Sequence, residues 1–375
     1  MNPTTLTATT NAPTGITGTA KHPTPRESTM DAVVLERQHE IQVRPIPGLR
    51  PVGPGEVRIG VHTVGICGSD VHYFTHGRIG PYVVEHPMVL GHEASGTVLE
   101  VGEGVDHLAV GDRVCMEPGI PNPRSRAARL GMYNVDPDVQ FWATPPVDGC
   151  LQPEIIHPAD FTYRLPEQLS LEEGALIEPF AVAVHAVTKA GLAPGDVVVV
   201  VGAGTIGVLT AIAAAASGAS RVYISDVAPE KFAQIEAYPT IHAVDVSRQD
   251  LGEAVREATD GWGADVVFEA SGSPRVFGNL WELPAPGGTV VLVGIPVDPV
   301  PLDVAAAQAR ELRIETVFRY ANSYQRAIEL AASPAVDLGA LISATYPFAD
   351  AVAAFERGAE GRPTDTKIQI RVAGA

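Results

Sequence analysis

Cysteine is scarce in this sequence. The 375 residues contain only three cysteines, at Cys67, Cys115 and Cys150. Three thiols cannot build a disulfide framework, and so low a number fits a reducing compartment, so we expect a cytoplasmic protein. The same shortage excludes a metal site made of four cysteines.

Positive charge and long apolar runs are also lacking. Lys and Arg number 26 against 44 Asp and Glu, which gives a formal charge of −18. A nucleic-acid partner needs a basic face that neutralises phosphates, and an anionic membrane surface attracts basic segments, so neither partner is expected. No apolar stretch reaches the roughly 18 residues of a membrane span. We therefore expect a small-molecule substrate.

Residues 1–29 carry almost no large apolar side chains and are rich in Thr, Pro, Ala and Gly. Such a segment cannot offset its ordering entropy, so we expect it to be disordered. It has no apolar core of the kind found in a secretory signal peptide. The sequence from Met30 to Leu35 predicts that the fold begins with an edge strand.

The pattern changes once along the rest of the chain. Up to about residue 175, short apolar runs such as 56–64 and 94–101 are separated by Pro and Gly, which indicates β-structure, and 117–150 is loop-like. From 176 to about 319, Val-rich and Ala-rich runs alternate, which predicts βαβ units and a parallel sheet. The tail predicts helices over 324–332 and 349–357 and a strand over 367–372.

A glycine motif follows the β-branched run Val197–Val201. Gly202, Gly204 and Gly207 give the pattern G-x-G-x-x-G, with a strand before it and an Ala-rich helix after it that stops at Gly218. The glycines permit a tight turn and close approach to a pyrophosphate, and the helix N-terminus favours the phosphates. A glycine turn that binds nothing is the alternative interpretation.

Asp226 ends the next predicted strand, nineteen residues after Gly207. A carboxylate at this position can accept hydrogen bonds from both ribose hydroxyls of NAD and would repel the 2′-phosphate of NADP. No Arg follows directly, and Lys231 is the nearest cation. We therefore predict NAD rather than NADP, with an ordinary strand-end acid as the alternative.

Cys67 and the adjacent pair His92 and Glu93 combine a thiol, an imidazole and a carboxylate. This donor set suits Zn²⁺, and three protein ligands leave one position for water or substrate, as in a catalytic zinc site. Gly91 and Gly96 permit the irregular backbone that would let both neighbours reach one ion. Taken singly, a Cys or a His is more often a structural residue.

The motifs together resemble the zinc-dependent medium-chain dehydrogenase superfamily, and within it the sorbitol/xylitol (polyol) dehydrogenases, over residues 30–375. The resemblance rests on the glycine motif and on the stretches 65–73, 76–80, 87–96, 117–119, 143–146, 173–179 and 317–320. It implies an α/β plus β fold, with a Rossmann doubly wound parallel sheet over 176–319. A discontinuous GroES-like β-barrel catalytic domain would cover 30–175 and 320–375. The family also suggests a homotetramer.

The resemblance implies roles for individual residues. Cys67, His92 and Glu93 match zinc ligands, and Glu178 matches a carboxylate that ligates zinc directly or through water. Ser69 and His72 match a proton relay, so Ser69, His72 and Glu178 are the catalytic candidates. The residues that match a substrate pocket are Tyr73, Phe141, Thr144, Arg319 and Tyr320. Those that match cofactor contacts, besides the three glycines, are Ile206, Asp226, Lys231, Val293, Gly294, Ile295, Val317, Phe318 and Arg319.

The chain departs from the family at a second, structural zinc site. The four cysteine positions of that site correspond here to Asn122, Ser125, Ala128 and Asp136. We therefore expect one catalytic zinc per chain and no structural zinc, with this lobe held by packing alone.

The function that follows is the reversible, NAD-dependent oxidation of a secondary hydroxyl of a polyol to the ketose. Sibling activities toward L-idonate, galactitol, L-threonine or 2,3-butanediol remain alternatives. A catalytically silent binding protein on the same fold is a third interpretation, which the intact ligand and relay residues disfavour.

Overall fold

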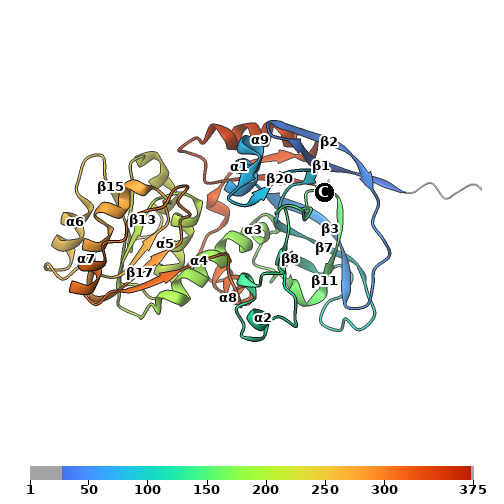
Figure 1. Cartoon of the computed structure of the whole chain (residues 1–375). Helices are drawn as coiled ribbons and strands as arrows, with labels where there is room; N and C mark the ends of the chain where they lie inside the picture. The colour runs from blue at the N-terminus through green and yellow to red at the C-terminus, as the bar shows by residue number, and fades with distance from the viewer. Residues whose placement is uncertain (1–27, 373–375) are drawn as a thin grey trace, which may run out of the picture.

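The computed structural model describes residues 28–372 and shows two β-sheet systems side by side, with α4 (Ile177–Ala190) between them (Figure 1). The predicted disorder of 1–29 falls on residues outside this range, except Ser28 and Thr29. For these two the prediction is wrong, because Gly48 N donates to Ser28 O at 2.6 Å and β1 (Thr29–Arg37) begins at Thr29.

A three-stranded antiparallel sheet opens the fold, in the order β2 (Glu40–Pro47), β1, β6 (Met88–Val89). The first strand was predicted to lie at an edge, but it lies in the middle. Val34 pairs with Val89 and Leu35 with Met88 on the side away from β2. This second neighbour comes from more than fifty residues further along the chain, so local patterning could not reveal it.

A seven-stranded sheet forms the rest of the β-rich part (right in Figure 1). Its C-terminal strand β20 pairs antiparallel with β3, with Gln369 opposite Gly65 and Ile370 opposite Val64. The strand β20 therefore lies directly beside the segment that precedes Cys67. The strands are, in spatial order, β12 (Thr162–Arg164), β8 (Arg113–Met116), β7 (Glu93–Val101), β3 (Glu56–Gly65), β20 (Lys367–Arg371) and β19 (Ile342–Pro347), with β11 (Glu154–Pro158) also paired to β3.

One helix within this part was not foreseen from the sequence. Cys67 N-caps α1 (Gly68–His76), and its backbone N–H donates to the carboxylate of Asp70 at 3.2 Å. Such a reciprocal cap satisfies N–H groups that a helix start leaves free. The helix α9 (Ala351–Glu360) packs against α1.

The loop-like stretch 117–150 contains only short elements. They are β9 (Gly119–Ile120), α2 (Arg126–Arg129), the 3-10 turn η1 (Tyr133–Val135) and β10 (Gln140–Phe141). Other short elements of the β-rich part are β4 (Arg78–Ile79), β5 (Tyr82–Val83), η2 (Ala159–Phe161), α3 (Leu171–Ala175), η6 (Gly339–Leu341) and η7 (Phe348–Asp350).

The predicted parallel sheet is confirmed. Its six strands lie in the order β15 (Ile241–Asp245), β14 (Arg221–Asp226), β13 (Val197–Val201), β16 (Ala264–Glu269), β17 (Pro284–Leu292) and β18 (Arg313–Thr316), all parallel. The order reverses between β13 and β16, and ligands of such sheets bind at the carboxyl ends of the strands near this point. Its helices are α5 (Thr205–Ala216), α6 (Leu251–Ala258), α7 (Val304–Ala309), η3 (Pro229–Ile235), η4 (Pro274–Gly278) and η5 (Leu280–Glu282).

The two parts share a hydrophobic core around α4. The helix α8 (Tyr324–Ala331) packs on α4, and Tyr324 and Ile328 belong to the same buried cluster as Val198 and Val200 of β13. The helix α8 also contacts the β-rich part, since the Tyr324 hydroxyl donates to Met116 O of β8 at 2.9 Å. The division at residue 320 remains a prediction. None of the helices within 28–372 is long and apolar enough to cross a membrane.

Candidate active site

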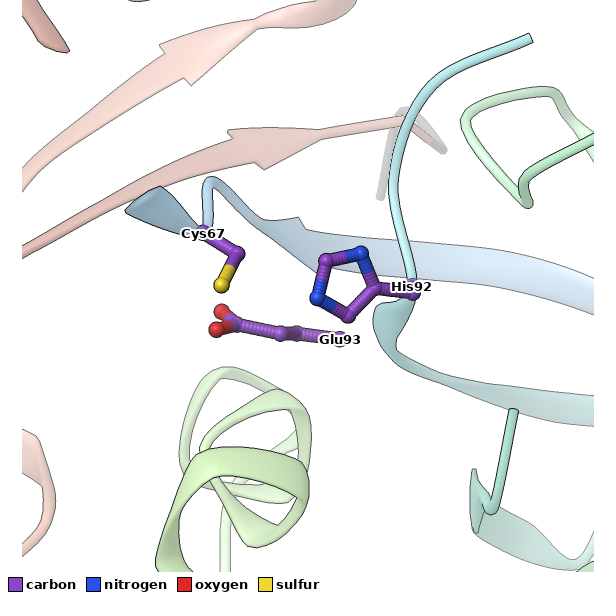
Figure 2. A group of neighbouring side chains, drawn as sticks. All are labelled: Cys67, His92 and Glu93. Atoms are coloured by element: carbon purple, nitrogen blue, oxygen red, sulfur yellow. The ribbon is translucent and has the colours of Figure 1, made fainter. Parts of the chain in front are cut away.

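Cys67, His92 and Glu93 meet at one point, as Figure 2 shows. One potential ligand atom from each lies within 4.8 Å of the others. Cys67 lies between β3 and α1, while His92 directly precedes β7 and Glu93 is its first residue. Gly91 has φ of +87°, and a Cβ there would stand 2.8 Å from Val64, so the turn before His92 needs glycine.

The chemistry of this group fits a zinc ion. Sulfur, imidazole nitrogen and carboxylate oxygen all bind Zn²⁺ at about 2.0–2.3 Å, so atoms no more than 4.8 Å apart can surround one ion with small adjustments. His92 is 5% exposed and Glu93 is 1% exposed, so both donor groups are buried. One ring nitrogen of His92 faces the Cys67 sulfur and the Glu93 carboxylate, where an ion would lie (Figure 2).

Asp70 holds the two ligand segments together, which sequence reasoning missed. It is fully buried, and its carboxylate accepts hydrogen bonds from the backbone N–H groups of Cys67 and Gly91, each at 3.2 Å. One of its oxygens also lies 3.5 Å from His92 Nδ1. A carboxylate behind a ligating imidazole orients the ring and sets its tautomer. Its position three residues after Cys67 was the available signal.

Lys367 is a second residue that sequence reasoning missed. Its ammonium group donates to both carboxylate oxygens of Glu93 at 2.7 Å and to Ile66 O at 3.2 Å, and the side chain is 3% exposed. The charge of Glu93 is therefore neutralised from the side of β20. No local signal marks Lys367, which is 274 residues from its partner.

Glu178 lies beside this group and outside the set of three. It is the second residue of α4, is 6% exposed, and accepts a hydrogen bond from the Tyr320 hydroxyl at 2.7 Å. Burial raises the pKa of Glu178 to about 7. The contact of Glu178 with a bound ion, directly or through water, stays a prediction.

The substrate candidates form a contiguous wall next to His92. The guanidinium of Arg319 stacks 3.7 Å from the ring centre of Phe141, which itself lies 5.6 Å from the His92 ring. Arg319 also donates to the hydroxyl of Thr144 at 3.5 Å. Tyr73 is 3% exposed, and burial raises its pKa to about 12. The structure thus links Arg319, Phe141 and Thr144 to one another beside His92, and Tyr320 to Glu178.

Ser69 and His72 lie one helical turn apart on α1, just after Cys67. Residues three apart on a helix share a face. Both are partly exposed, and the His72 ring stacks on His76 at 4.3 Å. Burial, together with the nearby His76, lowers the pKa of His72.

The glycine motif has the predicted geometry. Gly202 has φ of +102°, and a Cβ there would lie 2.9 Å from the Ser271 backbone. A Cβ on Gly207 would lie 1.9 Å from Gly202 O, so the third glycine allows the helix to pack against the turn. Gly204 N-caps α5, whose free N–H groups can receive a phosphate.

Asp226 ends β14 beside this turn. Its carboxylate accepts hydrogen bonds from Ala203 N at 2.9 Å, Ala228 N at 3.0 Å and Lys231 Nζ at 3.0 Å. Burial disfavours its charge, but these donors outweigh burial and lower the pKa of Asp226. It is therefore a fixed negative charge at the edge where a nucleotide would lie.

The remaining cofactor candidates gather at the carboxyl edge of the parallel sheet. Ile206 is the second residue of α5. The segment 293–295 follows β17; its Ile295 is 71% exposed, and its Gly294 lies against the Gly272 backbone. Val317 and Phe318 follow β18, with Phe318 41% exposed. These apolar side chains are available to cover a bound ring.

Two cavities lie near these elements. One of about 150 Å³ lies between the two parts and is lined by Cys67 and Gly68 on one side and Thr205 on the other. The other, of about 340 Å³, lies at the carboxyl ends of β13 and β14 next to Ser225. Arg275 lines this second cavity, and sequence reasoning did not identify it.

The expectation that the lobe without cysteines is held by packing alone is wrong. Asn122 N donates to Asp136 at 2.6 Å, and Ser125 caps α2 by accepting from Ala128 N at 3.0 Å. All four former cysteine positions therefore take part in hydrogen bonds inside the lobe.

Comparison with known families agrees with this geometry. Residues 53–167 match the family "Alcohol dehydrogenase GroES-like domain", and residues 205–333 match "Zinc-binding dehydrogenase". A "Putative D-xylulose reductase" of Rhizobium meliloti is 60% identical over 91% of this chain and 99% of its own length. The D-xylulose reductase of Morganella morganii is 52% identical over 88% of this chain and 98% of its own length.

Solved structures give the same result. An Escherichia coli oxidoreductase/dehydrogenase of unknown specificity superposes with a TM-score of 0.87 at 33% identity, over 92% of this chain and all of that one. A "putative zinc-binding dehydrogenase" from Sinorhizobium meliloti, bound to NADP, gives 0.84 at 29% identity over the same shares. The donor cluster, the glycine turn and these matches identify an oxidoreductase that uses zinc and a nicotinamide cofactor, and the chain belongs to the zinc-dependent medium-chain dehydrogenases, within their polyol dehydrogenase branch.

Proposed function

We propose that this enzyme interconverts a polyol and its ketose, with xylitol and D-xylulose as the preferred pair and NAD as the cofactor. The observation that carries the proposal is the cavity that has Cys67 on one wall and Thr205, at the start of α5, on the other. It places one donor of the cluster, Cys67, and one residue of the glycine motif, Thr205, on the same cavity. The names of the two relatives at 52% and 60% identity support the five-carbon substrate.

Cys67, His92 and Glu93 would hold the zinc, with Glu178 beside it. When bound, the ion lowers the pKa of the substrate hydroxyl, and the nicotinamide cofactor supplies the hydride acceptor. The protein aligns the substrate and excludes water. Arg319 offers donors to the further hydroxyls of a polyol, and Phe141 holds the guanidinium in place. The Tyr320 hydroxyl donates to Glu178, so its oxygen can accept a hydrogen bond from a substrate hydroxyl.

Ser69 and His72 would carry the substrate proton outward along α1. His72 is partly exposed and can pass a proton from its ring nitrogen to solvent. A lowered pKa keeps this imidazole neutral, and therefore able to accept a proton, at neutral pH.

The preference for NAD rests on Asp226. A carboxylate fixed by three donors can accept from the ribose hydroxyls and would repel a 2′-phosphate. We further propose a single zinc per chain. Within 28–372, the group around Cys67 is the one set of three or more His, Cys, Asp and Glu side chains close enough to hold an ion.

A screen of NADH formation tests the proposal. Xylitol, D-sorbitol, galactitol, L-idonate, L-threonine and 2,3-butanediol are each compared at equal concentration, with and without a chelator. We expect xylitol to give the highest kcat/KM, and chelation or Cys67→Ala to abolish turnover while NADH still binds. A preference for threonine or butanediol would assign the chain to a sibling activity. Full activity in a zinc-free Cys67→Ala protein would refute the mechanism.

A further inference from the structure

The segment 318–322 connects the parallel sheet to α8 and carries Arg319 and Tyr320. Its backbone is unusual, because Arg319 has φ of +55° and Asn322 has φ of +56°. Residues other than glycine adopt this region at a cost and keep it only where their surroundings enforce it. Something must therefore hold the segment at both ends.

The lobe 117–141 holds it through three hydrogen bonds. Asn134 Nδ2 donates to Phe318 O at 2.7 Å at one end. At the other end, Asn322 Nδ2 donates to Gly131 O at 2.9 Å and Asn322 N donates to the Tyr133 hydroxyl at 2.8 Å. The Asn134 bond therefore holds the chain just before Arg319, and the Asn322 bond holds it after Tyr320.

The lobe itself is anchored to the β-rich part. The Tyr133 hydroxyl donates to Glu117 at 2.8 Å, and the Tyr163 hydroxyl donates to the other oxygen of Glu117 at 2.9 Å. Glu117 follows β8 and is 1% exposed. The space between this lobe and Arg319 is filled, with a void of about 10 Å³ left. The position of the segment is therefore fixed relative to the sheet that carries His92 and Glu93.

We propose that Asn134 and Asn322 are positioning residues for polyol recognition. They act by holding the segment 318–322 so that the Arg319 guanidinium stays over Phe141 and the Tyr320 hydroxyl stays on Glu178. Donors of this kind recognise a substrate only when their supports hold them within about 0.5 Å. This inference rests on the proposed function in one respect, the contact of Arg319 with the polyol.

Two variants and one control test it. Asn134→Ala removes one bond, and Asn322→Gly removes the other side-chain bond while keeping a backbone that accepts positive φ. Asn122→Ala is the control, because Asn122 Nδ2 donates to Asp138 within the same lobe and does not bond to the segment. We expect Asn134→Ala and Asn322→Gly each to raise the polyol KM about fivefold, which corresponds to the free energy of one hydrogen bond, and Asn122→Ala to leave it unchanged. The KM for NAD⁺ should rise as well, because the same segment carries the cofactor candidates Phe318 and Arg319. The kcat should stay within about twofold, since uniform binding is what is lost.

A double-mutant cycle with Arg319→Met decides the route of the effect. If the asparagines act through Arg319, adding Asn134→Ala to Arg319→Met changes the polyol KM little further. The inference would be overturned if the fold-changes in polyol KM of Asn134→Ala and Arg319→Met multiplied in the double variant. An equal rise of the polyol KM in Asn122→Ala would also overturn it. An unchanged polyol KM in Arg319→Met would instead remove the substrate contact assigned under the proposed function, and this inference with it. A raised polyol KM in Asn134→Ala and Asn322→Gly but not in Asn122→Ala, together with a strongly raised polyol KM in Arg319→Met, supports both the proposed function and this inference.

Discussion

Lys367 donates to both carboxylate oxygens of Glu93 at 2.7 Å, so the third candidate zinc ligand already has a buried cationic partner on β20. Both side chains are nearly inaccessible, at 3% and 1% exposure. A carboxylate in such a place needs a positive charge, and here either the ammonium group or a bound ion can supply it.

The variant Lys367→Met should therefore destabilise the metal-free protein more than the zinc-loaded protein. Breaking one partner of a buried pair costs about 3–5 kcal/mol, because the other charge is left uncompensated. Zinc at Glu93 would restore much of that loss. The measurement is thermal unfolding with and without zinc, and a larger zinc-induced rise in Tm than in the unaltered protein is expected.

Arg371→Met provides the matched control on the same strand. Arg371 pairs with Glu172 at 2.7 Å, but the pair is exposed, so its loss should cost less than about 1 kcal/mol with or without zinc. Equal zinc responses in the two variants would show that the Lys367 pair does not belong to the metal site.

Asp226→Ser should relax the choice of cofactor. The variant removes the charge that opposes a 2′-phosphate and leaves Lys231 free to meet one, so kcat/KM should fall with NAD and rise at least about tenfold with NADP. Steady-state kinetics with both cofactors measure this. Asp245→Ser is the control, since Asp245 ends the neighbouring strand opposite Asp226 and bonds to Ser247. A similar change in both variants would contradict the assignment.

Glu117→Gln should alter how stability depends on pH. Burial raises the pKa of Glu117 from 4.5 to about 7, so between these values the folded state binds a proton that the unfolded state releases. Stability therefore falls as pH rises through this window, and the full loss of about 3 kcal/mol is present above pH 7. Urea unfolding should show that the free energy of unfolding of the variant, relative to that of the unaltered protein, is higher at pH 8 than at pH 5.

Glu56→Gln should give the opposite trend. The Arg50 side chain lowers the pKa of Glu56, so the contribution of Glu56 is present above pH 4.5 and is lost as pH falls. A Glu117 variant that followed the same trend as the Glu56 variant would disprove the role of burial at Glu117.

His76→Gln should move the acid limb of the kcat/KM profile to higher pH. The His76 ring stacks on His72 at 4.3 Å and adds to burial in lowering the pKa of His72. Without this like charge the pKa of His72 rises, so the proposed relay is protonated, and inactive as an acceptor, up to a higher pH. The exposed His107 gives a neutral control as His107→Gln. An unmoved limb in His76→Gln would argue that His72 does not control it.

Local patterns were reliable wherever one stretch of chain determines its own structure. Val197–Val201 forms a strand, and the glycines after it adopt the turn that their spacing predicts. The failures were of a different kind. The first strand became a central one because its second neighbour lies far away in the sequence. The lobe without cysteines proved to be hydrogen-bonded through pairs only 3 and 14 residues apart, which sequence reasoning overlooked.

The amino-acid sequence alone determined the parallel sheet, the nucleotide turn and the donor types at Cys67, His92 and Glu93, since each depends on residues close together in the chain. Only the tertiary structure decided that Lys367 neutralises Glu93 and that Asn134 meets Phe318. Those contacts join residues 274 and 184 positions apart. Sheet register and helix packing create them, and no local periodicity records which distant side chains they bring together.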